Sequence, residues 1–238
     1  MSVPPISILG IPVEGEFTKG DRVADRIAGA CEAEGISLLD GDVVVVTHKI
    51  VSKAEGRVAR MEAGDWEARD ALIEREGATF LRRNRSIAIT RTSHGFVCAS
   101  AGIDASNVEP GTVTLLPRDP DRSARSIRSR LRVLTGADVA VVISDTFGRA
   151  WRNGQTNVAI GVAGMLATIN YRDTVDTYGT VLKVTNIAIA DELAGAAEMV
   201  MGKAEGVPVA VVRGAPIRRG RGSVAAELVR PAHEDLFL

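Results

Sequence analysis

The chain has 238 residues, and its 29 lysines and arginines nearly balance 30 aspartates and glutamates, giving a formal net charge of −1. This balance argues against a general electrostatic affinity for nucleic acid or an anionic membrane, and the 45% hydrophobic share excludes disorder. The longest uninterrupted apolar stretch, Val158–Ala167, is about half of what a bilayer crossing needs. No secretory signal is visible and there are only two cysteines, so we expect a cytoplasmic protein with one domain over residues 1–238.

In the first third of the chain, apolar periodicity and glycine positions predict strands alternating with helices. The predicted elements are a strand at Ile6–Leu9, a helix from about Asp21 to Gly35, a strand at Asp42–Thr47 and a mostly helical segment at Trp66–Arg83 with a break at Gly77. The continuous β-branched run before Thr47 is typical of a strand that is covered on both faces.

In the rest of the chain, two adjacent strands interrupt the alternation. The predicted elements are strands at Ser86–Thr92 and Phe96–Ser100, a helix at Asp121–Leu134, a strand at Ala137–Ser144, a strand near Val181–Thr185, a helix near Ile189–Met201 and a strand at Pro208–Arg213. The order predicts an α/β or α+β fold with a mixed β-sheet flanked by helices.

Polar residues directly after the strand Asp42–Thr47 form a first candidate site. His48, Lys49, Ser52 and Lys53 follow the strand in quick succession. Lysines and hydroxyls at a strand end suit a phosphate or carboxylate group, although the segment lacks a P-loop pattern. An ordinary exposed turn is the alternative interpretation.

Two further candidate sites contain aspartates. Asp104 has small neighbours, with Ser106 and Asn107 close by, which would let oxygen ligands converge on Mg²⁺ or Mn²⁺. Its alternative role is an Asx turn. Asp145 ends a predicted buried strand and is followed by Thr146 and Arg149, which suits a metal ligand with an arginine to neutralise phosphoryl charge. The alternative is that Asp145 caps a following helix.

Four segments, read in order, carry a family resemblance. They are VVVVTHKIVSKAEGR, CASAGIDASNV, ISDTFGRAWRNGQTNVAIG and TYGTVLKVTNIAIADELAGAAEMVMGK. Together they resemble the coenzyme F420-0:γ-glutamyl ligases, and the similarity runs from Gly10 to Gly214. The resemblance implies an enzyme that uses GTP, Mg²⁺ or Mn²⁺, and K⁺ as an activator. It would join L-glutamate to the terminal carboxylate of F420-0, and then further γ-linked glutamates, through an acyl phosphate.

The resemblance also implies roles for individual residues. Asp104, Asp145 and Thr146 would be metal ligands, with Arg149 beside the reacting groups. The implied nucleotide-binding residues are Glu16, Phe17, Thr18, Lys19, His48, Lys49, Lys53, Asn107, Met201, Gly202, Lys203, Glu205 and Gly206. The family often has Gln or Glu, a further metal ligand, where this chain has Lys203. Glu205 is a possible substitute, so the number of metal ions stays open.

The resemblance further implies a homodimer and, since the chain ends at Leu238, no fused reductase domain. The apolar stretch Val158–Ile169 could supply an intersubunit surface or could be core within one chain. Two alternative functions stay open: a non-catalytic nucleotide- or deazaflavin-binding protein, and a carboxylate–amine ligase with another anionic acceptor.

Overall fold

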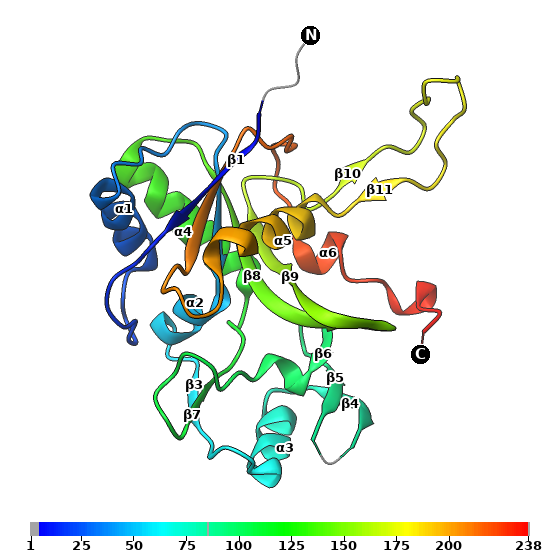
Figure 1. Cartoon of the computed structure of the whole chain (residues 1–238). Coiled ribbons are helices and arrows are strands. Elements are labelled where there is room, and N and C mark those ends of the chain that lie inside the picture. The colour runs from blue at the N-terminus through cyan, green and yellow to red at the C-terminus, as the bar shows by residue number, and fades with distance from the viewer. Residues whose placement is uncertain (1–4, 85, 238) are drawn as a thin grey trace.

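The computed structural model describes residues 5–84 and 86–237, and a five-stranded mixed sheet forms its centre (Figure 1). The strands in spatial order are β1 (Ser7–Ile11), β12 (Val209–Arg213), β2 (Val43–Thr47), β8 (Ala140–Arg149) and β9 (Arg152–Ala163). The pair β2–β8 is parallel, and the other pairs in this sheet are antiparallel. The predicted mixed sheet flanked by helices is confirmed.

Helices cover both faces of this sheet, which explains why Val43–Val46 is fully buried. Helix α5 (Ile189–Met201) packs on one face, while α4 (Pro120–Thr135) and α1 (Val23–Ala33) cover the other (Figure 1). Helix α2 (His48–Ala54) begins directly after β2. A strand covered on both faces can be apolar at every position, as the sequence predicts for β2.

A smaller unit lies between α2 and α4 in the sequence and below the main sheet in Figure 1. Its elements are β3 (Val58–Arg60), α3 (Trp66–Arg75), β4 (Thr79–Arg83), β5 (Ala88–Arg91), β6 (Val97–Ala99), a 3₁₀ turn (Ser100–Gly102) and β7 (Thr112–Thr114). It has a small apolar core of its own around Ile73, Ala88 and Ala101. The chain leaves this core directly before Asp104, so the unit positions that residue.

An arm projects from the body of the protein between β10 (Ile169–Asn170) and β11 (Asn186–Ile187) (Figure 1). Tyr178 and Val184 on this arm are largely exposed. After β12 the chain ends with helix α6 (Val224–Glu227) and a 3₁₀ turn (Ala232–Glu234). Within residues 5–84 and 86–237, no helix combines the length and the apolar character needed to cross a bilayer.

The hairpin β8–β9 contains a bulge at the place where it leaves the sheet. Ile143 pairs with Gly161, but the next residue, Ser144, pairs with Ala159, so that Ile160 is an extra residue in β9. Ser144 is also the last residue of β8 that pairs with β2. A bulge bends a strand and redirects its side chains. Beyond this point β8 carries Asp145 and Thr146 away from the sheet.

Several sequence predictions are wrong in detail. The break predicted at Gly77 is present, since α3 ends at Arg75 and Gly77 adopts a positive φ of 70°, but the helix does not resume: the chain turns into β4, which pairs with β5. No strand covers Val181–Thr185; this segment belongs to the arm. Asp145 caps no helix, because β8 continues through it to Arg149.

The apolar stretch Val158–Ile169 is largely buried in the core of the protein. Ile160, Val162 and Met165 are at most 1% exposed and belong to the main core. The interpretation of this stretch as core within one chain is therefore correct, and its use as an intersubunit surface is not, because its larger side chains already pack against the protomer's own helices.

Candidate functional site

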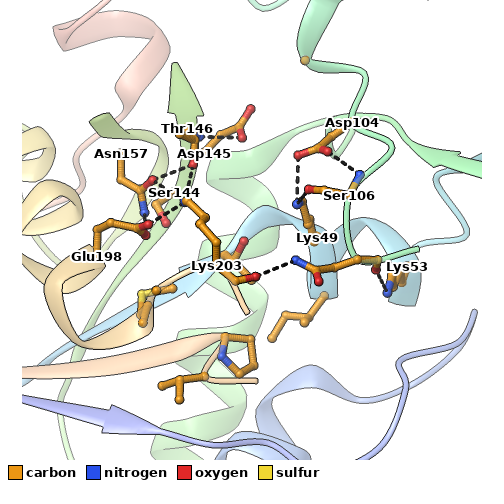
Figure 2. A pocket seen from close by; sticks show the side chains of 18 of the residues that line it. Lys49, Lys53, Asp104, Ser106, Ser144, Asp145, Thr146, Asn157, Glu198 and Lys203 are labelled. Carbon is orange, nitrogen blue, oxygen red and sulfur yellow. Dashed lines mark hydrogen bonds and ion pairs between the residues drawn. The ribbon is translucent and has the colours of Figure 1, made fainter. Parts of the chain in front are cut away.

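A pocket of about 780 Å³ opens where β2 and β8 end, between α2, the loop after Gly102 and the end of α5 (Figure 2). Binding sites for small molecules commonly have volumes of about 300–1,000 Å³. The sequence-predicted residues that line it are Glu16, Phe17, Lys49, Lys53, Asp104, Asn107, Asp145, Thr146, Met201, Gly202, Lys203 and Gly206. The fold thus brings together residues from every predicted candidate segment.

Each lysine of the pocket is paired with a carboxylate. Nζ of Lys49 lies 2.9 Å from Oδ2 of Asp104, and Lys53 forms an ion pair with Glu16. Nζ of Lys203 lies 2.7 Å from Oε1 of Glu198. Three ammonium groups and their three partner carboxylates therefore face the same space with their charges balanced.

The loop that carries Asp104 is held by local hydrogen bonds. The backbone N–H of Ser106 donates to Oδ1 of Asp104 at 2.7 Å, so the expected Asx turn is present, although the aspartate also lines the pocket. Burial alone would raise the pKa of Asp104, but the hydrogen bonds from Lys49 and Ser106 outweigh it and hold this pKa below its ordinary value. Asp104 is therefore an anion at neutral pH.

Asn107 connects this loop to two sides of the pocket, through hydrogen bonds with Lys53 and Lys203. Its backbone adopts a left-handed conformation with a φ of 54°, which asparagine tolerates better than most residues. Its carbonyl oxygen accepts a hydrogen bond from Lys53 at 2.6 Å, and its Nδ2 donates to the carbonyl oxygen of Lys203 at 3.1 Å. The loop and the end of α5 are thus joined across the pocket.

Asp145 is only 8% exposed, at the base of the pocket. Its Oδ1 accepts a hydrogen bond from the backbone N–H of Thr146 at 2.6 Å. Nε2 of His48 lies 3.2 Å from the same oxygen, as a close electrostatic contact without the geometry of a hydrogen bond. His48 is almost fully buried and does not line the pocket, so it contacts Asp145 from the protein interior.

Among the pocket residues that sequence reasoning missed are Asn157 on β9 and Glu198 on α5. Oγ1 of Thr146 donates to Oδ1 of Asn157 at 2.7 Å, and Nδ2 of Asn157 donates to Oε2 of Glu198 at 2.7 Å (Figure 2). A signal was available for each. Glu198 lies three positions before Met201 and shares its helix face, and Asn157 comes directly before the apolar run of β9.

A comparison with known families matches residues 14–214 to the family described as F420-0:γ-glutamyl ligase. A protein of Methanothermobacter thermautotrophicus named coenzyme F420:L-glutamate ligase is 42% identical, covering 100% of this chain and 99% of its own. Proteins with the same name in Methanopyrus kandleri and Archaeoglobus fulgidus are 39% and 38% identical, and the alignments cover 98% and 97% of those proteins. The chain belongs to the F420-0:γ-glutamyl ligase family.

Some residues to which the resemblance gives roles lie outside the pocket wall of this family member: Thr18, Lys19, His48, Arg149 and Glu205. Arg149 is exposed near the tip of the β8–β9 hairpin, where it donates to the carbonyl oxygen of Asn153 at 2.8 Å. The long hairpin carries it past the pocket, because β8 continues for several residues beyond Asp145.

The oxygen donors of the pocket fit a hard divalent cation. Asp104, Asp145 and the Thr146 hydroxyl offer two carboxylates and one neutral oxygen, and Mg²⁺ is often held by one or two carboxylates with substrate phosphates completing its shell. In the part of the chain that the structure describes, no group of three or more His, Cys, Asp or Glu side chains forms a protein-only metal cage.

Proposed function

We propose that the protein joins L-glutamate to coenzyme F420-0, with GTP as the co-substrate and Mg²⁺ or Mn²⁺ as the cofactor, and that it adds further γ-linked glutamates. The names of the similar proteins support glutamate ligation. Potassium as an activator follows from the family resemblance alone. The proposed reaction would take place in the cytoplasm.

The lysine–carboxylate pairs Lys49–Asp104 and Lys53–Glu16 are the observation that carries the use of a metal-bound nucleotide. A triphosphate that entered alone would attract Lys49 and Lys53 but would leave their carboxylate partners, Asp104 and Glu16, unpaired. Divalent cations that enter with the nucleotide compensate those carboxylates. The pocket can then exchange its internal ion pairs for pairs with the ligand at little net cost in charge.

The reaction needs an activated carboxylate, because a carboxylate is a poor electrophile at neutral pH. A carboxylate oxygen of F420-0 attacks the γ-phosphorus of GTP, a P–O bond breaks, and GDP leaves. The amine of glutamate, after losing its extra proton to water, attacks the acyl carbon; the amide forms and inorganic phosphate leaves. The metal ion, when bound, would neutralise phosphate charge, while the lysines would orient the phosphates and Asp104 and Asp145 would hold the cation.

A second part of the proposal concerns assembly. We propose a homodimer, with the arm between β10 and β11 as the contact, because Tyr178 and Val184 on it are 94% and 83% exposed. Exposed apolar side chains on a projecting segment are typical of an interaction surface. Sedimentation of the intact protein at micromolar concentrations should give a dimer, and a monomer throughout would contradict this part.

A coupled assay of GDP release tests the catalytic proposal. GDP should appear only when both F420-0 and L-glutamate are present, and mass spectrometry should show F420-0 gaining glutamyl units. GTP hydrolysis that neither co-substrate changes would contradict it. Turnover with a different carboxylate acceptor would favour the other ligase, and binding of GTP without any turnover would favour the non-catalytic protein.

A further inference from the structure

The side-chain ammonium of Lys203 lies among three oxygen atoms that come from three different elements. Its Nζ is 2.8 Å from Oγ1 of Thr146 on β8, 3.3 Å from Oδ1 of Asn157 on β9 and 2.7 Å from Oε1 of Glu198 on α5 (Figure 2). These oxygens converge on one point beside Asp145, at the wall of the pocket.

The hydrogen bonds among these residues explain why only lone pairs point at Lys203. The Thr146 hydroxyl donates its hydrogen bond to Oδ1 of Asn157, and the Asn157 side-chain NH₂ donates a hydrogen bond to Glu198. Asn157 is 4% exposed and held on both sides, so its amide oxygen is fixed toward the pocket. A hydroxyl oxygen, an amide oxygen and a carboxylate oxygen arranged in this way form a binding site for a cation.

The backbone of Lys203 is held in place independently of its side chain. Its carbonyl oxygen accepts the hydrogen bond from Asn107, and α5 ends just before it at Met201. The side chain is more than half exposed, so packing does not force it toward the three oxygens. Electrostatic attraction to the site is the remaining reason for its position.

We propose that the Lys203 ammonium fills an oxygen-lined cation site, so that the chain supplies by itself a positive charge that a free cation would otherwise provide. This inference concerns the pocket of the proposed ligase, but it rests on the oxygen cluster and not on turnover. The site in the wild-type protein then holds no free ion. A substitution that removes the ammonium and keeps the oxygens opens the site to an ion from solution.

The test counts bound cations in the intact protein without nucleotide. Lys203→Gln replaces the ammonium with an amide and leaves Thr146, Asn157 and Glu198 in place. Mn²⁺ titrations followed by electron paramagnetic resonance should show one more bound ion per chain than in the wild type. A second measurement detects a monovalent ion: the thermal unfolding midpoint of each protein is compared in potassium chloride and in choline chloride at equal ionic strength.

Two further variants make the result specific. In Lys203→Gln combined with Glu198→Gln, the site has lost its carboxylate, and the gain should disappear. Lys183→Gln, a change of the same kind at an exposed lysine on the arm, should leave the cation count unchanged. Circular dichroism checks that each variant is folded. If Lys203→Gln is not folded, Lys203→Met is used in its place.

A gain of either Mn²⁺ or potassium in the Lys203 variant, lost in the double variant, supports the proposal and identifies the charge of the ion that the ammonium replaces. No gain of either cation overturns it, as does an equal gain in Lys183→Gln. Because the measurement needs neither GTP nor F420-0, its outcome is separate from that of the ligase assay.

Discussion

Asp104 and Lys49 join the smaller unit of the protein to the main sheet: Oδ2 of the aspartate lies 2.9 Å from Nζ of the lysine, which comes from the helix directly after β2. The loop that carries Asp104 follows the small core around Ile73. This ion pair therefore fixes the distance between two walls of the pocket, and several consequences can be measured.

The first prediction concerns the protonation of Asp104. Its pKa in the folded protein lies below the ordinary value of 3.8, so its ion pair stabilises the fold fully above that value, and the contribution is lost as the pH falls through the lower, folded-state pKa. Lys49→Met should raise this pKa, measured by carbon NMR titration of the carboxyl group. Lys183→Met is the control and should leave it unchanged. An unchanged pKa in Lys49→Met would show that the lysine is not its cause.

The second prediction concerns the two aspartates of the proposed metal site. Asp145→Asn keeps the shape and removes the charge, and it should lower kcat at least about a hundredfold, which corresponds to about 3 kcal/mol. Asp104→Asn should act similarly, and the double variant should show much less than the sum because both serve one site. Asp173→Asn, on the exposed arm, is the matched control. Near-normal turnover of either single variant at low metal concentration would refute the site.

The third prediction follows from the lysine–carboxylate ion pairs of the pocket. A non-hydrolysable GTP analogue should bind at least about tenfold more tightly with Mg²⁺ than without it, a difference of about 1.4 kcal/mol. The reason is that the carboxylates released by Lys49 and Lys53 need a compensating cation. Calorimetric titrations with and without Mg²⁺ measure the difference. Equal affinities would contradict the exchange of ion pairs.

Much of the main sheet could be predicted from the sequence, because the relevant signals are local. The β-branched run of β2, the Gly136 that ends α4 with a φ of 75° and the apolar face of α5 are each visible in a short window. Strand β4 could not be predicted in this way. Its residues, Thr79–Arg83, have no clear alternation, and they are extended because β5 is available as a partner.

The candidate site was predictable where a strand end delivers polar residues, as at Lys49 and Asp145. It was not predictable where the contact depends on how distant elements pack. Glu198 reads as an ordinary exposed residue of an amphipathic helix until α5 is placed against β9, where Asn157 meets it. Arg149 illustrates the opposite case: the sequence groups it with Asp145, but the strand that carries it is longer than its apolar part suggests, and Arg149 lies outside the pocket wall.

The fourth prediction tests the packing of α4 against β9. A Cβ on Gly161 would lie 2.4 Å from the backbone carbon of Pro120, which is too close for any real contact. Gly161→Ala should therefore destabilise the fold by about 1–3 kcal/mol or more. Gly29→Ala, on the exposed side of α1 with open space around it, should stabilise by about 0.5–1 kcal/mol. Urea unfolding of both variants measures the contrast, and equal stabilities would rule out the tight contact.

The fifth prediction concerns the two cysteines. Burial, together with the negative charge of Asp145, raises the pKa of Cys98 to about 12, and burial also raises that of Cys31. Both thiols are therefore protonated at neutral pH and unreactive as nucleophiles. A thiol reagent should find no reactive thiol in the native protein and two after unfolding. Rapid reaction of the native protein would show that one of the two sites opens.

The extra residue Ile160 in the β8–β9 hairpin separates two parts of one strand pair that can change independently. On the sheet side, the pairing of Val141–Ile143 is locked by β2 and by the helices on both faces. On the outer side, β8 pairs with β9 alone. The loop at the hairpin tip can thus lengthen or shorten, and reshape the pocket rim, without shifting the register of the core. Deleting Ile160 itself would remove the bulge and merge the two parts into one regular strand pair.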